Sequence, residues 1–570
     1  MRKRQLAVGV RMVVLWAVVF VVAAGGMAGA VGPQAPEATK GKLWVFFADK
    51  GIARADLRTA LDAFAAELSD RALARRAKMG LAVNVNDLPV ARRYIDAVRE
   101  TGAEVVTRSR WLNGVSVLAG PAERDAIGRL PFVREIRPVG RGVKELPREV
   151  VPVDEGVGDS RGRLDYGPSN DQLVQIQVPQ VHDDGFDGSG ILICMLDTGF
   201  DIDHEAYRHL DLVGERDFVN DDTETADEPG DPVGQDSHGT KTLSCVGGRT
   251  PGRLYGGSYN ASFLLGKTEI LDQEIQVEED YWVEGVEWAD SLGADIVSSS
   301  LGYIDWYTFE DMDGNTAVTT IAADMAAARG IVMVNSMGNE GGSGYVHMIA
   351  PADGDSVVSV GAVDGFGFLA SFSSVGPTYD GRIKPDVVAP GYPVYVATTA
   401  DTDSYGYSSG TSFSCPLTAG AIGLLLQGHP DWTPQDVLDA LHATATQSST
   451  PDTLMGWGIL QSYDAMHSSP LGVADQPLTG PRIVRSHPNP FSPETVVEFA
   501  VPSAGPVRLE IFDVAGRVVR VLERADLPAG SFERRWDGND SAGSAVASGV
   551  YFIRLETAGR LANEKVVLLR

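Results

Sequence analysis

Three side chains that lie far apart in the sequence offer the components of a nucleophilic hydrolase. Asp197 directly follows the apolar run ILICML, His238 stands in DSHGT, and Ser412 stands in GTSFSCP before another apolar stretch. A serine hydroxyl becomes a nucleophile when a base takes its proton and a carboxylate orients that base. The three residue types therefore predict attack by Ser412, proton transfer by His238 and orientation of the imidazole by Asp197.

Two further loops fit the same chemistry. Asn339 follows the apolar run GIVMVN, and its amide is expected to donate a hydrogen bond to the oxyanion of a tetrahedral intermediate. The small-residue stretch SSSLG ends another apolar run. Its last residues, Ser300, Leu301 and Gly302, are predicted to bind substrate, because an exposed strand edge can pair with an extended peptide.

The residues around Ser412 favour a helix that begins at the nucleophile. A helix N-terminus stabilises developing negative charge. Pro416 has no N–H, so the Ser412 carbonyl loses its usual helical partner. The competing interpretation is a buried helix start without chemistry. The motifs around Asp197 and His238 are each common in turns, and the GTSFSCP motif before an apolar helix is the stronger signal; coincidence is a poor explanation for all of them together.

The elements that must position these residues alternate between strand and helix patterns from about 160 to 468. Near-continuous apolar runs such as ILICMLDT, ADIVSSSLG and GIVMVNSMGN are typical of strands buried on both faces of a parallel sheet. Helical patterns such as TAVTTIAADMAAARG lie between them. The predicted fold class of this region is α/β, with a parallel sheet flanked by helices.

The flanking regions differ in character. Residues 42–141 read as a small α+β module, with helices predicted over 55–77 and over 86–102 capped by Asn86 or Asp87. Residues 469–481 read as a linker. Residues 482–570 alternate with period two and predict an all-β sandwich. A polar stretch at 141–163 is expected to be exposed and cleavable.

Charge is distributed unevenly along the chain, whose formal net charge is -29. Residues 151–480 hold 51 acidic and 11 basic residues, whereas residues 41–150 hold 14 acidic and 20 basic ones. The acidic middle argues against nucleic acid as a partner, because phosphates would be repelled. The opposite signs of net charge suggest that residues 41–150 and residues 151–480 bind each other.

The N-terminus and the cysteines indicate an exported protein without a disulfide framework. Residues 1–30 combine basic residues, an apolar stretch and the small residues AGA, which is typical of a secretory signal peptide; a retained membrane anchor is the alternative. The three cysteines, Cys194, Cys245 and Cys415, are an odd number in apolar surroundings and are expected to be buried. Cys415 lies off the serine position and is not expected to be the nucleophile.

The motifs LDTGFDIDH, DSHGTKT, SSSLG, SMGNEG and GTSFSCP resemble those of the subtilases, the subtilisin-like serine peptidases, across about 310 residues. The resemblance implies a secreted serine endopeptidase with Asp197, His238 and Ser412 as its triad and Asn339 as oxyanion donor. It implies protein or peptide substrates, no cofactor for the chemistry and a seven-stranded parallel sheet. Cys415 departs from the family, where small aliphatic residues are more usual at this place.

The flanking modules carry resemblances of their own. Residues 42–141 look like an inhibitor-type subtilase propeptide, which implies autoprocessing and a propeptide that binds its own enzyme. An unrelated N-terminal domain is the alternative. The segment with HPNPFSPETVVEFAVP and WDGNDSAG resembles FlgD-like and type IX secretion sorting domains, which implies secretion machinery or a cell surface as partner. A carbohydrate- or protein-binding sandwich is the alternative.

Calcium is a candidate structural ion, because the acidic loop 217–236 precedes His238 and many subtilases bind this ion. A solvated acidic loop is the competing interpretation, and no individual ligand is named. The stretch from Asp311 does not continue as an EF-hand, since Thr316 and Ala322 occupy its glycine and closing glutamate positions.

Two other functions remain open at this point. One is an inactive subtilase that serves as a surface binding protein. The other is an adhesive protein in which the C-terminal sandwich does the main work. The complete set of four catalytic loops argues against the first. For the second, deletion of residues 482–570 would abolish function while peptidase activity survived.

Overall fold

The computed structural model describes residues 40–139, 164–271, 275–468, 482–487, 491, 494–514, 516–557 and 560–568. The predicted signal peptide, the predicted cleavable stretch and the predicted linker lie outside these described residues. Within them, no helix combines the length and the apolar character that crossing a bilayer requires.

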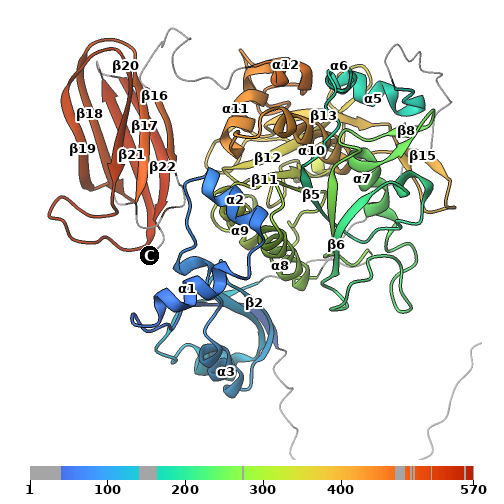
Figure 1. Ribbon diagram of the computed structural model, residues 1–570. Coiled ribbons are helices and arrows are strands. Elements are labelled where there is room, and N and C mark those ends of the chain that lie inside the picture. The colour runs from blue at the N-terminus through green and yellow to red at the C-terminus, as the bar shows by residue number, and fades with distance from the viewer. Residues whose placement is uncertain are drawn as a thin grey trace, which may run out of the picture. The chain divides into compact units, whose positions relative to one another are not determined.

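The central region is built on a sheet of seven parallel strands, as the apolar runs predict (Figure 1). Its strand order is β13-β12-β11-β10-β5-β9-β6. The strands are β5 (Leu192–Asp197), β6 (Asp211–Asp217), β9 (Ser262–Lys267), β10 (Ile296–Ser299), β11 (Val332–Ser336), β12 (Val357–Asp364) and β13 (Val387–Tyr392). Every residue of β5, β10 and β11 is buried, which explains why their sequences show no polar alternation.

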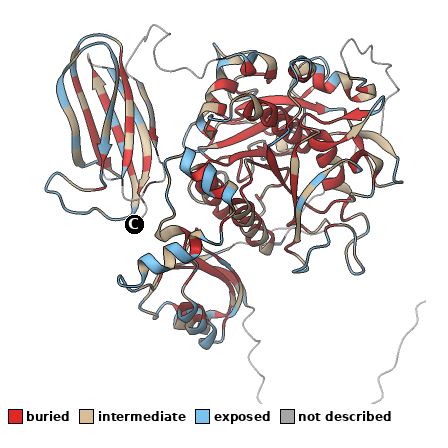
Figure 2. Cartoon of the chain, viewed as in Figure 1, coloured by how far each residue is buried: buried red, intermediate tan, exposed pale blue. Residues whose placement is uncertain are grey.

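Helices cover both faces of this sheet, so the side chains of each strand enter two apolar cores. Helices α7 (Ser237–Gly247), α10 (Thr411–Gly428) and α11 (Pro434–Thr444) contribute to one core, together with Ile193 and Met195 of β5. Helices α8 (Val277–Leu292) and α9 (Val318–Ala327) contribute to the other. Figure 2 shows the buried residues concentrated in the central strands and in the helices packed on them.

Shorter elements complete the central region. They are α5 (Asn170–Gln175), α6 (Val178–Asp183), β7 (Arg249–Thr250), β8 (Leu254–Tyr255), β14 (Val394–Ala397), β15 (Tyr405–Ser408) and α12 (Ser462–Met466).

The N-terminal module is a four-stranded antiparallel sheet with two helices in the order β-α-β-β-α-β, with extra helices after its first strand. Its strands are β1 (Gly41–Phe47), β2 (Glu104–Ser109), β3 (Gly114–Ala119) and β4 (Val133–Pro138), and its core helices are α3 (Arg92–Glu100) and α4 (Pro121–Ile127). Trp44, Phe46 and Trp111 join the core that contains α8 and α9. The module is therefore packed against that face of the central region.

Two helix predictions in this module are wrong in their boundaries. The helix predicted over 55–77 is two helices, α1 (Leu57–Ala65) and α2 (Asp70–Lys78). Ser69 separates them because its side chain caps α2, accepting a hydrogen bond from the Ala72 N–H at 3.1 Å. The helix predicted over 86–102 is a 3₁₀ turn at Val85–Asp87 followed by α3, and the turn is capped by Asn84 instead of Asn86 or Asp87.

The C-terminal segment forms two antiparallel sheets around one apolar core, which agrees with the predicted all-β sandwich. Its strands are β16 (Arg482–His487), β17 (Thr495–Val501), β18 (Gly505–Asp513), β19 (Val518–Leu527), β20 (Gly530–Trp536), β21 (Gly549–Thr557) and β22 (Arg560–Leu568).

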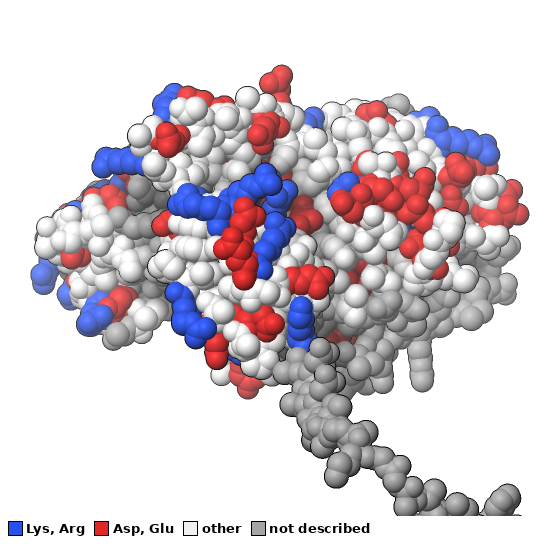
Figure 3. Space-filling model, turned by 90° about the horizontal axis from the view of Figure 1, so that it is seen from below, with Lys and Arg blue, Asp and Glu red and all other residues white. Residues whose placement is uncertain are grey.

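The surface of the molecule carries both signs of charge: in Figure 3, basic side chains gather near the middle of the face and acidic ones mainly toward its right.

Candidate active site

The sheet brings the predicted catalytic residues to one edge. Asp197 is the last residue of β5, and Asn339 follows β11, so both lie at the carboxyl ends of parallel strands. His238 and Ser412 are each the second residue of a helix, α7 and α10. In open parallel sheets this edge is where binding sites are normally built.

Asp197 and His238 form a close pair. His238 Nδ1 lies 2.6 Å from Asp197 Oδ1, and the Asp197 carboxylate is buried. The other carboxylate oxygen accepts a hydrogen bond from the Thr242 hydroxyl at 2.8 Å. Because Thr242 lies one turn after His238 on α7, one helix supplies both contacts to the carboxylate. The pair is thereby fixed in the orientation that a general base requires.

A glycine permits this close approach of α7 to β5. A Cβ on Gly239 would lie 2.1 Å from the Gly199 carbonyl oxygen and 3.0 Å from Asp197 Cβ. Any side chain there would push α7 away from the carboxylate. The glycine of the DSHGT motif is therefore a requirement of packing between the helix and the strand end.

Ser412 stands at the N-terminus of α10, with its carbonyl held by a side chain. Pro416 deprives that carbonyl of its helical partner, and the Ser300 hydroxyl donates to it instead at 2.7 Å. The ring centroids of His238 and Phe413 lie 6.1 Å apart. Among the described residues, no hydrogen bond joins the Ser412 hydroxyl to His238. Such bonds commonly tighten only when substrate is bound.

The side chain of Asn339 is oriented by the first residue of α10. Its Oδ1 accepts hydrogen bonds from the Thr411 N–H at 3.0 Å and from the Thr411 hydroxyl at 3.1 Å. This pattern assigns the amide oxygen to the helix and turns the NH₂ group away from it. The Thr411 hydroxyl also accepts from the Gly338 N–H at 3.2 Å. The NH₂ group is thus the end of the amide that can donate to another group.

The predicted substrate-binding stretch follows β10, but two of its groups have other partners. The Ser300 side chain bonds to Ser412, as above, and the Leu301 carbonyl accepts from Asn335 Nδ2 at 3.0 Å. A Cβ on Gly302 would lie 2.5 Å from side-chain carbons of Ile349. Sequence reasoning missed Thr242, Thr411 and Ile349. Of these, only Thr242 carries a readable signal, its spacing of four residues from His238.

Cys415 is a buried structural residue. Its Sγ donates toward the Ser299 and Val334 carbonyl oxygens, both at 3.4 Å. Burial raises the pKa of this thiol to about 12, so the reactive thiolate is scarce near neutral pH. Cys194 and Cys245 are also buried and free, as the sequence predicts.

The acidic loop offers a poor calcium site. Three carboxylates, from Asp217, Asp222 and Glu228, come within 4.8 Å of one another. The buried Lys267 ammonium already lies 2.8 Å from Asp217 and 2.7 Å from Asp231. Calcium prefers six to eight oxygen ligands. Because a lysine neutralises part of this cluster, the side chains present do not make a calcium cage.

Comparison with known proteins decides the family. Residues 188–458 match the model of the subtilase family. Subtilisin NAT of Bacillus subtilis subsp. natto is 32% identical over 312 residues, which are 54% of this chain and 73% of that protein. Subtilisin of Bacillus pumilus is 33% identical over 275 residues, 48% of this chain and 90% of that protein. The chain belongs to the subtilase family.

The flanking modules of this subtilase are matched as well. Residues 42–150 match a Peptidase S8 propeptide domain of Bacteroidota, and residues 493–560 match a FlgD Ig-like domain. The solved structure of fervidolysin from Fervidobacterium pennivorans, a keratinolytic enzyme related to subtilisin, has the same fold. It aligns with a TM-score of 0.56 at 21% identity, covering 92% of this chain and 72% of that one. This subtilase is therefore a serine-type endopeptidase that carries its own propeptide.

Proposed function

We propose that this subtilase is a secreted endopeptidase that hydrolyses peptide bonds through Ser412, His238 and Asp197 and that matures by cutting off its own propeptide. The observation that carries the proposal is the 2.6 Å contact between His238 Nδ1 and the buried Asp197 carboxylate, with Ser412 at the neighbouring helix N-terminus. The proposed organisation is a signal peptide at 1–30, a propeptide at 42–141, a peptidase domain at 160–468 and a sorting or attachment domain at 482–570.

The chemistry follows the roles of the three groups. Ser412 Oγ forms a bond to the scissile carbonyl carbon while its proton moves to His238 Nε2. The tetrahedral intermediate collapses when the C–N bond breaks, and the imidazolium returns the proton to the leaving amine. Water then hydrolyses the acyl-enzyme by the same route. Asp197 keeps the imidazole in the tautomer whose Nδ1 carries the proton.

Asn339 is proposed to stabilise the oxyanion. Thr411 holds its amide oxygen, which supports the assignment of the NH₂ group as the donor. The free N–H groups and the dipole of the first turn of α10 act on the same charge. One such side-chain donor typically contributes about 10²–10³ in kcat. The mechanism requires no cofactor.

Paired expression of the wild type and Ser412→Ala tests this function. Mass spectrometry of the chain ends and hydrolysis of casein are measured for both. Both proteins are expected to lose the signal peptide after Ala30 when they are exported. The wild type should then cut itself within about 141–163 and digest casein, whereas Ser412→Ala should do neither. If the two proteins behave alike, the catalytic assignment fails and the fold serves binding. Asn339→Ala should cut itself and digest casein, but slowly.

A further inference from the structure

Helix α8 of the peptidase domain has a composition that a free surface helix does not explain. It carries six acidic residues and no Lys or Arg: Glu278, Glu279, Asp280, Glu284, Glu287 and Asp290. Like charges spaced by three or four residues destabilise a helix. The propeptide supplies the missing cations, for example Lys42, whose Nζ lies 2.7 Å from Asp280. The acidic helix is therefore suited to a basic partner.

The most densely paired carboxylate is Asp290 in the last turn of α8. Two consecutive arginines of the propeptide helix α2 reach it, Arg75 at Oδ1 and Arg76 at Oδ2, the latter at 2.6 Å. The side chains of both arginines are at most 3% exposed. Although burial favours the neutral carboxyl, these guanidinium groups hold the pKa of Asp290 below its usual value. Asp290 is thus a buried charge that depends on arginine partners.

Arg75 also binds the ends of two helices. Its Nη1 donates to the Ala294 carbonyl at 2.5 Å, just after α8, and its Nε donates to the Arg329 carbonyl at 3.0 Å, just after α9. Carbonyl groups at helix C-termini lack intrahelical partners and carry partial negative charge. A planar guanidinium can satisfy several of them at once, which an ammonium cannot do in the same geometry.

Glycines give α2 the room to come this close. A Cβ on Gly293 would lie 2.6 Å from the Ala72 nitrogen, and one on Gly330 would lie 2.9 Å from Met79 Cγ. Both glycines follow the helices that Arg75 binds. We call the surface formed by Asp290, Gly293, Ala294, Arg329 and Gly330 the arginine socket.

The arginine socket lies at the opposite edge of the sheet from the catalytic residues. Gly293 and Gly330 lie two or three residues before the first residues of β10 and β11, so the socket is at the amino ends of these strands. Asp197 ends β5, which spans six residues. At about 3.3 Å per residue, the two edges are separated by roughly 15–20 Å. A ligand in the socket is therefore not a ligand of the catalytic cleft.

We propose that the arginine socket is an exosite, a second protein-binding surface of the peptidase domain whose ligand is a helix with two consecutive arginines. Its resident ligand is α2 of the propeptide. The part that concerns substrates rests on the proposed function: once the propeptide has been cut off and released, the socket binds arginine-paired helices of protein substrates. Release of the whole propeptide removes Arg75, Arg76 and Arg110 from the Asp290 carboxylate and removes Arg75 from the helix-end carbonyls, so the vacated surface selects the same chemistry.

Binding is tested first in chains that cannot cut themselves. The probe is a fluorescein-labelled peptide of residues 66–82, AELSDRALARRAKMGLA, measured by anisotropy. In Ser412→Ala the chain's own α2 fills the socket, whereas adding Arg75→Gln and Arg76→Gln removes the two guanidinium groups by which α2 binds Asp290, so that the peptide can compete for the site. The peptide is expected to bind the second chain at least about 100-fold more tightly, since loss of one partner of a buried ion pair is strongly destabilising.

Controls of equal net charge distinguish binding at the arginine socket from nonspecific electrostatic attraction of the peptide. Arg54→Gln and Arg58→Gln, two exposed arginines, remove the same charge and should leave the peptide excluded. A peptide with Gln in place of Arg75 and Arg76 should bind no chain, and one with Lys at these two positions should bind about tenfold more weakly than the arginine peptide. Equal binding of the lysine peptide, or equal binding to the Arg54 and Arg58 control, overturns the proposal.

A measurement without substitutions in α2 guards against misfolding of the double variant. The peptide is added to processed wild type, freed of its propeptide, with Ser412 blocked by a sulfonyl fluoride. It should bind there as it does to the Arg75→Gln, Arg76→Gln chain. No binding to either protein overturns the proposal.

The consequence for substrates is a separate readout. A short cleavable peptide is joined through about 20 Gly and Ser residues, spanning about 25 Å, to the 66–82 helix or to its double-Gln version. The arginine tag is expected to lower KM about tenfold or more without changing kcat, because it adds binding remote from the reaction. Equal KM values refute the substrate role. If neither peptide is cut, the proposed function fails, while binding to the Ser412→Ala chains still decides the exosite.

Discussion

The two edges of the parallel sheet use charge in opposite ways. At the carboxyl edge the pair proposed for catalysis, Asp197 and His238, is held by short contacts. At the amino edge Arg75, Arg76 and Asp290 belong to a dense buried network. The first arrangement keeps one imidazole available for proton transfer. The second fixes one protein surface against another.

This difference shows how the same interaction serves chemistry or attachment. A buried carboxylate with one histidine partner leaves the second imidazole nitrogen free to react. A buried carboxylate with arginine partners alone has no titratable partner near neutral pH, since guanidinium groups keep their protons. Proton transfer at the carboxyl edge, which we also call the catalytic edge, can therefore be impaired by changing a single group. Attachment of the propeptide at the amino edge is expected to respond to changes that alter the balance of charge.

The largest expected effect concerns the catalytic edge. Asp197→Asn should lower kcat about 10⁴-fold because the imidazole loses its orienting carboxylate and takes the wrong tautomer. Thr242→Val removes only the hydroxyl that bonds to Asp197 Oδ2 and should lower kcat about tenfold. Steady-state kinetics on a short peptide measure both, with thermal unfolding to show that the fold persists. Equal losses in the two variants would mean that the pair acts through folding and not through proton transfer.

The catalytic edge could be read from the sequence because its residues stand in short motifs at strand ends. The apolar runs around Cys194 and Val334 indicate buried parallel strands, and the carboxyl ends of such strands meet at one edge. Pro416 even predicts a Ser412 carbonyl without a helical partner. What the sequence does not show is that Ser300 fills this gap, since nothing local links two residues that the fold brings together.

The amino edge could not be read in this way. Arg75 and Asp290 are separated by more than two hundred positions, and no local motif links them. Opposite net charges predict that the two segments attract each other. Net charge does not specify which residues of the two segments form pairs. The sequence pattern predicts one long helix through Ser69, and this prediction hides the separate helix that carries the arginines.

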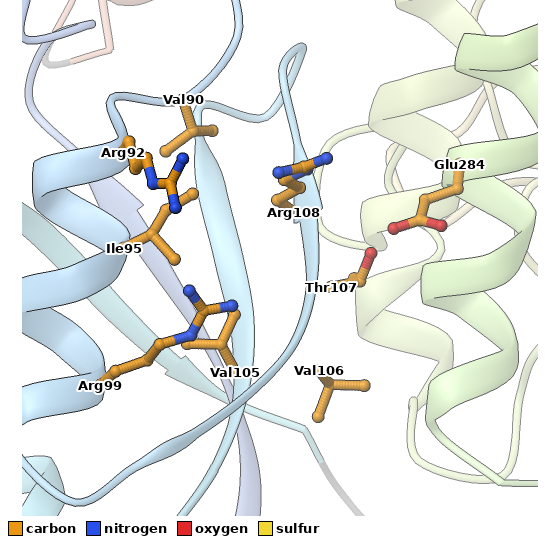
Figure 4. A pocket seen from close by; sticks show the side chains of 9 residues that line it. All are labelled: Val90, Arg92, Ile95, Arg99, Val105, Val106, Thr107, Arg108 and Glu284. Atoms are coloured by element: carbon orange, nitrogen blue, oxygen red, sulfur yellow. The ribbon is translucent and has the colours of Figure 1, made fainter. Parts of the chain in front are cut away.

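The next largest effect concerns the pH dependence of the amino-edge interface. Glu284 of α8 faces β2 of the propeptide (Figure 4). Burial, then the neighbouring Asp280 and Glu287, raise its pKa to about 7, against the lowering influence of Arg108. In the released enzyme the pKa should return toward its ordinary 4.5. The complex therefore binds a proton that the free enzyme lacks, and the affinity for the propeptide falls as pH rises from 4.5 to 7.

In the wild type, the affinity for the propeptide should fall between pH 5 and pH 8. In Glu284→Gln this fall should be about tenfold smaller. Processed enzyme with Ser412 sulfonylated is incubated across this range, and the fraction of propeptide that co-elutes with the peptidase is measured. Burial also raises the pKa of Glu279 to about 7, so part of the dependence should remain. Glu310→Gln, an exposed change of equal charge, should follow the wild type. An unchanged slope in Glu284→Gln would show that the interface does not sense this carboxyl.

The smallest effect returns to the catalytic edge, where a thiol lies three residues from the proposed nucleophile. Cys415 is wholly buried, and burial raises its pKa to about 12, so it should not react with iodoacetamide at pH 7.5. Cys415→Ala leaves a small void and should cost about 1–2 kcal/mol of stability while kcat changes less than about threefold. A sulfonyl fluoride should inactivate both proteins equally through Ser412. If iodoacetamide inactivates the wild type but not Cys415→Ala, the thiol is accessible, and the separation between a reactive serine and an inert buried cysteine on α10 does not hold.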